Sequence, residues 1–193
     1  MKQIIEGLKS FRPILEEKAE PHKVTGFYAF FVISNNCFSH TFLEELKQGT
    51  CIYIGIAENE TLYERVFKSH LKDTGKSTFR RSMGAVLRNE LCLQPIKRGV
   101  TATRSNISNY TFNLESEKRL TNFMYQHLWL AFYPYSDSKV AFEEIEKQLI
   151  KEFGFPAFNL EYGNSYENVF FQRIKQARKE CRDIVARQIE LKK

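Results

Sequence analysis

GFYAFFVI at residues 26–33, followed by CIYIGI at residues 51–56, decides the fold of this chain. Both segments are rich in β-branched and aromatic residues, have the length of a strand and are bounded by polar or glycine-containing turns. We predict that they are neighbouring strands of one sheet. The first segment alternates between two apolar faces, which is typical of a central strand. In the second, alternation puts Ile52, Ile54 and Ile56 on one face, which we expect to be core, and Tyr53 on the other.

Length and composition indicate an ordinary globular protein. The chain has 193 residues, of which 42% are hydrophobic and 27% are charged, and this is enough to bury a core in one domain. A net charge of +6 suits a polyanionic partner without requiring one. The four cysteines have no paired spacing and histidines are few, so we expect no structural zinc site. The N-terminus lacks the apolar run of a signal peptide, no segment reaches membrane-spanning length, and we expect a cytoplasmic protein.

Periodicity places helices around these strands. Helical patterns with apolar stripes cover residues 3–19, interrupted at Pro13, and residues 41–47, 61–71, 78–91, 116–127, 137–153 and 166–193. Short strands are expected at 110–114 and 128–133, and 94–109 is expected to be a loop or irregular hairpin. The fold class is therefore α+β, with a small central mixed or antiparallel sheet flanked by helices and a long basic C-terminal helix. We divide the chain into an N-terminal helix (1–23), a central domain (24–162) and the C-terminal helix (163–193).

The tripeptides Gly26-Phe27-Tyr28 and Tyr53-Ile54-Gly55 resemble the paired signature of the GIY-YIG nuclease family, with Phe in place of the first Ile. The later residues that resemble the family follow in its order: Arg65, His70, Glu146 and Asn159. The resemblance covers roughly residues 24 to 160. It implies that Tyr28 activates the attacking water, that Tyr53 positions it, and that Arg65 balances charge on the phosphate. Relatives with a Lys just after the second motif differ from this chain, which has Ile56.

His70 departs from the spacing of the family. The family places a basic or aromatic partner, often His, four residues after the arginine, whereas His70 is five residues after Arg65. In a regular α-helix that spacing turns the two side chains about 140° apart. Either the helix carries a one-residue bulge or it ends before His70.

Glu146 stands apart from both stripes of its predicted helix. Phe142, Ile145 and Leu149 form the apolar stripe, and Lys and Glu residues four apart form the solvent stripe. A half-buried carboxylate requires a cation or donors nearby, so Glu146 is either part of a structural salt bridge or a metal ligand. The family resemblance favours the second, with Glu146 holding Mg²⁺ or Mn²⁺ together with waters and a phosphate oxygen.

Basic and polar residues outside the strands are candidates for DNA binding. Ser77 is a suitable N-cap for the helix 78–91, in which the sequence 77–82 resembles a Ser-Thr-x-Arg-Arg-Ser motif of one branch of the family. We expect a cationic face there, beside the bare backbone of Gly84, and a base-reading loop beyond it. The alternatives are a solvated arginine face and a plain surface loop. The candidate DNA-binding residues are Arg80, Arg81, Arg88, Arg98, Arg104 and Asn106.

Two functions from different classes follow. The first is a metal-dependent DNA endonuclease, of a restriction or defence type because no separate DNA-binding domain is evident. The second is a non-catalytic nucleic-acid-binding module with the same fold, and a repair role or an RNA substrate also stays open. The C-terminal helix either packs on its own domain, which we favour, or forms a homodimer through a seam with heptad spacing. That seam comprises Phe170, Ile174, Ala177, Cys181, Ile184, Gln188 and Leu191.

Overall fold

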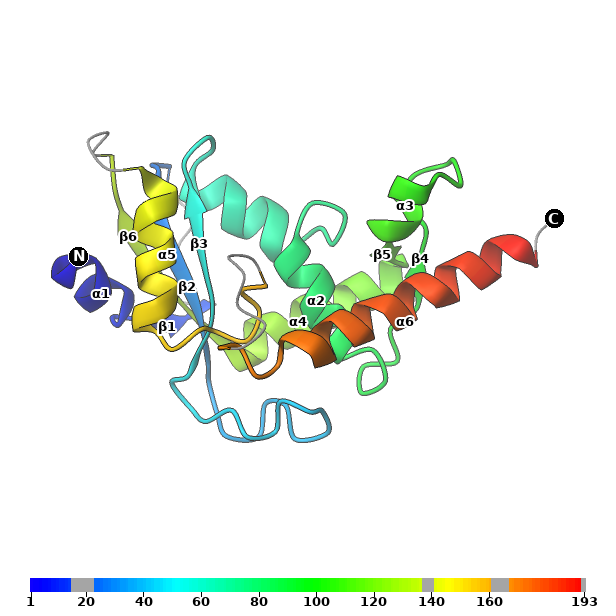
Figure 1. Ribbon diagram of the computed structural model, residues 1–193, viewed down its shortest axis with the longest axis horizontal. Helices are drawn as coiled ribbons and strands as arrows, with labels where there is room; N and C mark the ends of the chain where they lie inside the picture. The colour runs from blue at the N-terminus through cyan, green and yellow to red at the C-terminus, as the bar shows by residue number, and fades with distance from the viewer. Residues whose placement is uncertain (15–22, 137–140, 161–166, 192–193) are drawn as a thin grey trace.

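The computed structural model describes residues 1–14, 23–136, 141–160 and 167–191, and within them an α+β fold surrounds a four-stranded antiparallel sheet (Figure 1). The strand order is β1-β6-β2-β3. The strands of this sheet are β1 Arg12–Pro13, β2 Gly26–Val32, β3 Cys51–Ala57 and β6 Leu128–Pro134. A second, two-stranded sheet pairs β4 Pro95–Ile96 with β5 Thr111–Phe112. The expected α+β class, the pairing of the two signature strands and the central place of the first are confirmed.

Within the described residues, seven helical segments surround the sheets. They are α1 Lys2–Leu8, the π-helix η3 Glu64–His70, α2 Thr78–Val86, α3 Arg104–Ser108, α4 Leu114–His127, α5 Phe142–Glu152 and α6 Phe171–Glu190. Helices α1 and α5 pack on one face of the large sheet, against Phe27, Ala29 and Phe31. The other face carries η3, α2 and α4 on Tyr28, Phe30 and Val32, and α6 packs in turn on α2. Every residue of β2 is buried, as a strand covered on both faces must be.

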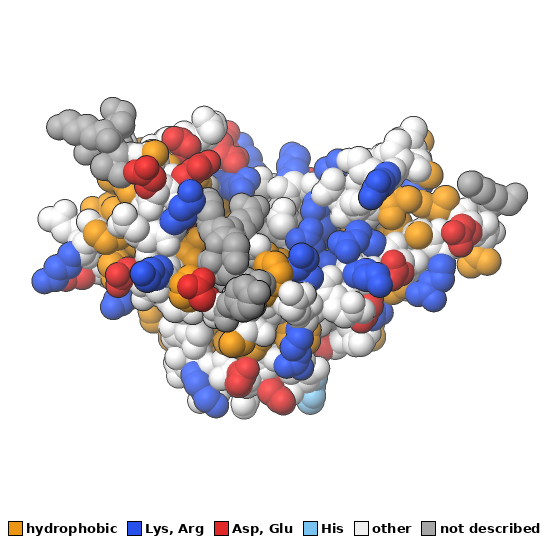
Figure 2. Space-filling view, in the orientation of Figure 1, with side chains coloured by type: hydrophobic (Ala, Val, Ile, Leu, Met, Phe, Trp, Pro, Cys, Tyr) orange, Lys and Arg blue, Asp and Glu red, His pale blue; other side chains and the backbone are white. Residues whose placement is uncertain are grey.

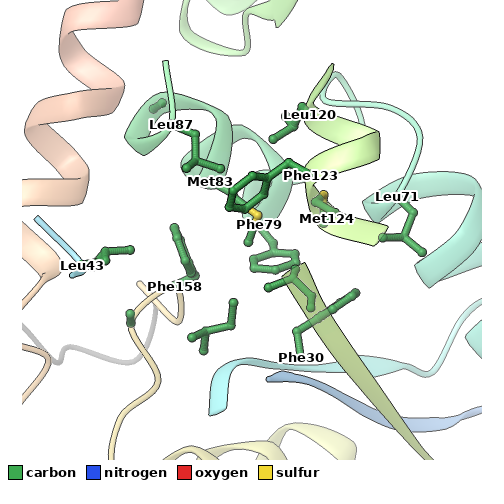
Figure 3. Close-up of a cluster of buried hydrophobic side chains, with 14 of the residues drawn as sticks. Phe30, Leu43, Leu71, Phe79, Met83, Leu87, Leu120, Phe123, Met124 and Phe158 are labelled. Atoms are coloured by element: carbon green, nitrogen blue, oxygen red, sulfur yellow. The ribbon is translucent and has the colours of Figure 1, made fainter. Parts of the chain in front are cut away.

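The core on the second face is rich in aromatic and long aliphatic side chains. Phe30 of β2, Phe79 and Met83 of α2, Phe123 of α4 and Phe158 converge there (Figure 3). The rings of Phe30 and Phe79 lie 4.8 Å apart between centroids, and those of Phe79 and Phe158 lie 5.6 Å apart. This packing fixes α2 against the middle of the sheet.

A β-bulge changes the expected orientation of β3. Phe30 lies opposite Tyr53 but Phe31 lies opposite Cys51, so Ile52 is the extra residue of the bulge. Ile52 packs in the core with Phe30, whereas Ile54 packs in the core on the opposite face. The prediction that the isoleucines share one face is therefore wrong, because strict alternation does not survive a one-residue shift.

Two predicted helices differ in the structure. Residues 41–47 form hydrogen-bonded turns, not a helix, with Thr41 Oγ1 accepting the backbone N–H of Leu43. The N-terminal helix ends at Leu8, and Arg12 and Pro13 then pair with β6 as an edge strand, a position that Pro tolerates. The predicted start of α5 at Asp137 lies outside the described residues.

The C-terminal helix packs on its own domain, the alternative that we favoured. Ile174, Ala177, Cys181 and Val185 are buried in the core that α2 also lines. Val185 takes the place that the seam assigned to Ile184, and Leu191 is 88% exposed. None of the described helices has the length and apolar character needed to cross a membrane.

Candidate active site

Tyr28 lies at the centre of the candidate site, where β2 and β3 pair. Its backbone partner across the strands is Gly55. A Cβ atom on Gly55 would come within 2.5 Å of Cζ of Tyr28, so any side chain there would displace the tyrosine ring. Glycine at this position therefore allows the Tyr28 ring to lie across β3.

The π-helix brings His70 to Tyr28. Hydrogen bonds in a π-helix join residues five apart, as Leu71 N–H and Val66 C=O do here at 2.9 Å. Five residues then cover about the same rotation as four in an α-helix, so His70 returns to the side of Arg65. Tyr28 Oη lies 2.5 Å from His70 Nε2 and 3.4 Å from Arg65 Nε. Of the two alternatives for His70, the bulged helix is the one that forms.

We assign the hydrogen bonds around Tyr28 with its hydroxyl as the donor to His70. Arg65 can only donate, so the Tyr28 oxygen accepts from it, and the Tyr28 hydroxyl donates to Nε2 of His70. His70 Nδ1 lies 2.6 Å from Ser77 Oγ, and this assignment makes Nδ1 the donor. Ser77 Oγ also accepts the N–H of Arg80 at 2.9 Å, as the N-cap of α2. The N-cap thus holds the histidine ring in one orientation.

Burial keeps both members of this pair neutral. Burial, and then Tyr53, raise the pKa of Tyr28 well above its usual value near 10. Burial, followed by repulsion from Arg65 and Arg80, lowers the pKa of His70 well below its usual value near 6.5. His70 is therefore an unprotonated imidazole at neutral pH, with Nε2 ready to accept the tyrosine proton.

Arg65 joins this pair to an open pocket at the surface. Its Nη1 lies 3.3 Å from a carboxylate oxygen of Glu60, and the side chain is 34% exposed. The pocket has a volume of about 320 Å³ and is also lined by Glu58, Asn59 and Glu143. Arg65 thus has its Nε on the buried tyrosine and its outer nitrogens at the surface.

Glu146 lies in a second, smaller pocket next to Tyr53. It is 8% exposed and shares a cavity of about 50 Å³ with Tyr53, Phe158 and Asn159. The rings of Tyr28 and Tyr53 are 6.1 Å apart. Tyr53 lines this small cavity, and Arg65, which donates to Tyr28, lines the larger pocket. A water occupies about 30 Å³, so this cavity admits one ion or one to two waters.

The donor set fits Mg²⁺ better than zinc. Within the described ranges no three His, Cys, Asp or Glu residues gather closely enough to hold a metal. One carboxylate completed by waters and a substrate phosphate is the usual arrangement for Mg²⁺. Glu146 would supply that carboxylate.

Asn159 is close to Glu146, but its carboxamide is bonded to the backbone. Its Oδ1 accepts the N–H of Ile54 at 2.9 Å and its Nδ2 donates to the carbonyl of the same residue at 2.8 Å. It therefore positions β3 directly behind Tyr53.

The predicted cationic face of α2 is not exposed, which corrects the assignment of Arg80 and Arg81 to direct DNA contact. Arg80 is 0% exposed and pairs with Glu117 at 2.8 Å, and Arg81 is 3% exposed and donates to the carbonyl of Tyr110. The space beside Gly84 is also filled, because a Cβ there would meet the Phe112 ring at 2.4 Å. The partners of both arginines come from distant segments that helical spacing does not reveal.

The remaining candidate DNA-binding residues are dispersed. Arg88 pairs with Glu180 of α6 at 3.5 Å and lines a pocket of about 560 Å³. Arg98 donates to the carbonyl of Gly75. Arg104 is exposed on α3, and Asn106 Nδ2 bonds to the carbonyl of Thr101. The structure brings none of them to Tyr28.

Two residues of the site were missed from the sequence. Ser77 was identified only as an N-cap, and its contact with His70 follows from the π-helix. Glu60 carried no signal, because its pairing with Arg65 depends on the turn after β3.

A comparison with protein-family models matches residues 26–180 to a model described as the GIY-YIG catalytic domain. The match extends into α6, beyond the region covered by the sequence resemblance. Searches of curated proteins and of solved structures found no match.

Proposed function

The chain belongs to the GIY-YIG family, and from this premise we propose that it is an endonuclease that hydrolyses phosphodiester bonds of DNA with the help of a divalent metal ion. Membership of this family implies nuclease activity in general. DNA as substrate, Mg²⁺ or Mn²⁺ as cofactor and a restriction or defence role are our proposals. The four cysteines are free thiols, which supports a reducing cytoplasm.

The observation that carries the proposal is the Tyr28–His70 contact. A tyrosine is a poor base at neutral pH unless its proton has somewhere to go. An unprotonated imidazole nitrogen at 2.5 Å gives the proton a destination. A π-helix that turns His70 toward Tyr28 is an unusual structure, and π-turns are frequent at functional sites.

In the proposed reaction Tyr28 relays a proton from water to His70. As the water oxygen forms its bond to phosphorus, its proton passes to the Tyr28 oxygen and the Tyr28 proton passes to Nε2. The bond to the leaving oxygen breaks, and that oxygen takes a proton from solvent. Nδ1–H keeps its hydrogen bond to Ser77 Oγ throughout, so the imidazolium forms without movement of the ring.

A substrate phosphate would replace Glu60 as the ion-pair partner of Arg65. Tyr28 is fully buried in this conformation, and its hydroxyl accepts from Arg65, which lines the larger pocket. A phosphate that pairs with Arg65 in place of Glu60 would draw the guanidinium outward and admit water to the hydroxyl. The positive charge then balances the charge that gathers on the phosphorane.

Glu146 would hold the metal ion, which when bound polarises the phosphate and stabilises the leaving oxygen. The carboxylate lines the same cavity as Tyr53, whose ring would orient the attacking water. No other described side chain of the small cavity carries a negative charge.

The test is cleavage of supercoiled plasmid with and without Mg²⁺, using the wild type and Glu146→Gln. We expect the wild type to cut only with metal, and the variant to bind DNA but not to cut it. Mg²⁺-dependent cleavage by Glu146→Gln would overturn the metal assignment. A wild type that binds DNA yet cuts neither DNA nor RNA with Mg²⁺ or Mn²⁺ would instead support the binding-module alternative.

A further inference from the structure

A pocket of about 560 Å³ lies at the end of α2 that is remote from Ser77. Its walls come from three segments: the turns at 40–42, the end of α2 with the residues that follow it (85–90), and the first half of α6 (172–180). Its volume is within the range of pockets that bind small molecules, about 300 to 1,000 Å³. The candidate active site shares no residue with it.

The charged side chains of this pocket balance one another. Arg88 pairs with Glu180 at 3.5 Å, and Glu180 also accepts from Nε2 of Gln176 at 3.3 Å. The other charged side chains of the lining, Arg173 and Glu90, are of opposite sign. Acidic and basic side chains are also mixed over α6 and the turns after β2 (Figure 2). A phosphate therefore gains little net attraction from these walls, and an uncharged ligand suits them better.

Glu90 has a carboxylate oxygen without a partner. Its Oε2 is closed off from solvent and makes no hydrogen bond within the described part of the chain. A buried acceptor that lacks a donor costs free energy. Rotation about the last bond of a Glu side chain costs little, so an N–H group that enters the pocket can bond to this oxygen. The ligand should therefore carry donors on the edge that faces Glu90.

Phe42 and Arg173 provide flat surfaces in the same pocket. Cζ of Arg173 lies over the Phe42 ring, 4.6 Å from its centroid. Aromatic rings and guanidinium planes are the surfaces on which proteins stack unpaired bases. The amide side chains of Asn89 and Gln172 also line the pocket and can bond to the polar atoms of a base.

We propose that this pocket binds one unpaired nucleobase of the substrate strand, with a preference for guanine, by stacking at Phe42 and Arg173 and by hydrogen bonds to Glu90. This inference rests on the proposed nuclease function, which makes a nucleic-acid strand the source of the base. The Watson–Crick edge of guanine has two neighbouring N–H donors, which match the two oxygens of a carboxylate. Thymine has one N–H between two carbonyl oxygens, which a carboxylate repels. Because a base inside a duplex is stacked and paired, the bound nucleotide must be single-stranded or flipped out.

The pocket is several nucleotides away from the candidate active site. Ser77, which contacts His70, is the N-cap of α2, and Val86 at the other end of α2 lines the pocket. The nine residues of α2 span roughly 14 Å at about 1.5 Å per residue. Successive nucleotides rise about 3.4 Å along a strand. The base in the pocket would therefore lie beside the cleavage position and not at it.

The experiment measures binding of short fluorescein-labelled single strands by anisotropy in EDTA. One strand is all thymine, and the other carries one guanine at its centre. Glu90→Gln keeps the shape of the side chain and replaces an acceptor by a donor, and Phe42→Leu removes the ring. Glu44→Gln is the matched control, because Glu44 is an exposed residue close to Phe42 in sequence that does not line the pocket.

We expect the wild type to bind the guanine strand several-fold more tightly than the all-thymine strand. Glu90→Gln should remove this preference. Phe42→Leu should weaken binding of the guanine strand by roughly 5-fold or more, the usual effect of losing one stacked base. The control should match the wild type with both strands. Thermal unfolding checks that each variant is folded, and if Phe42→Leu is not, Glu90→Gln alone decides.

A parallel titration with free guanosine monophosphate distinguishes a base in a strand from a free nucleotide. If the substitutions weaken binding of the free nucleotide alone, the pocket does not bind the substrate strand and the inference is wrong.

The remaining outcomes separate this inference from the proposed function. If the wild type cuts plasmid but both variants keep the affinity and the guanine preference of the control, the inference is wrong and the function stands. If the guanine preference depends on Glu90 although the wild type never cuts, the base pocket stands and the nuclease proposal fails.

Discussion

At the scale of single residues, the site depends on uncharged side chains that are joined by hydrogen bonds. Tyr28, His70 and Ser77 form one line of hydrogen bonds that joins β2, η3 and the N-cap of α2. None of the three carries a formal charge at neutral pH in this arrangement. Removing one atom from the line therefore changes chemistry without leaving an unpaired charge in the core.

Tyr28→Phe removes only a hydroxyl from this line. We expect the cleavage rate to fall by roughly 100-fold or more, the usual contribution of an acid–base group, with the fold retained. Circular dichroism and single-turnover cleavage provide the measurement. Tyr63→Phe is the control, because Tyr63 is a half-buried tyrosine whose ring packs on Phe67. Equal losses in the two variants would identify Tyr28 as a core residue only.

The pH dependence follows from His70. The relay needs an unprotonated Nε2, and the pKa of His70 is lowered, so kcat/KM should be flat at neutral pH and fall only on the acid side of 6.5. The folded state binds this proton less readily than the unfolded chain, so the free energy of unfolding should also decrease as pH falls below that value. A pH–rate profile and urea unfolding at several pH values test both. An acid limb centred at or above the ordinary histidine pKa would contradict this role for His70.

Arg80 should matter to stability, not to DNA affinity. Arg80→Ala would leave the half-buried Glu117 without its cation, at a cost of about 3 kcal/mol in the free energy of unfolding. The exposed Arg104→Ala, by contrast, should change it by no more than about 0.5 kcal/mol. Urea unfolding of both variants measures these changes in the free energy of unfolding. A fully stable Arg80→Ala with weakened DNA binding would restore the original assignment of Arg80.

At the scale of elements, the π-helix compensates for one additional residue between Arg65 and His70. Deleting Lys68, which is exposed, gives the spacing of four residues that an α-helix needs to bring both side chains to Tyr28. We expect this variant to fold and to keep measurable cleavage. Lys68→Ala, which keeps the chain length, is the matched control and should behave as wild type within about 0.5 kcal/mol. A folded but inactive deletion variant would mean that the π-turn itself is required.

Sequence reasoning was most successful where a local pattern decides the structure. Strands β2, β3 and β6 and helices α2 and α4 carry strong periodicity, and their existence was predicted from it. The bulge at Ile52 and the turns at 41–47 were missed, since a register shift and loop packing leave no periodic signal. The burial of Arg80 and Arg81 was missed because Glu117 and Tyr110 reach them from other elements. The candidate site residues were identified from the order in which the family places them. Only the structure shows that the helix carries a bulge and does not end before His70.

At the scale of the whole molecule, one chain supplies one candidate metal carboxylate, and α6 uses its apolar side within its own domain. Four members of the predicted dimer seam, Phe170, Ile174, Ala177 and Cys181, are buried in the core of the same chain. The homodimer stays a prediction that this packing does not require.

We expect a monomer that makes double-strand breaks by two successive nicks. Sedimentation of the full chain, with and without a DNA duplex, should give the mass of one subunit. A plasmid time course should accumulate the nicked circle before the linear form. Direct conversion of supercoiled to linear plasmid, together with the mass of a dimer on DNA, would favour paired subunits instead.

The carboxamide of Asn159 has a consequence for the boundary of the sheet. Strand β3 is an edge strand, and a row of open N–H and C=O groups on such a strand is a template for pairing with another chain. Asn159 engages both backbone groups of Ile54, and the N–H of Phe158 bonds to the carbonyl of Ile52. The Asn159 side chain and the backbone N–H of Phe158 thus satisfy edge groups of β3 as a further strand would. The candidate catalytic tyrosines can therefore lie next to an edge strand whose backbone groups at Ile52 and Ile54 are not available for self-association.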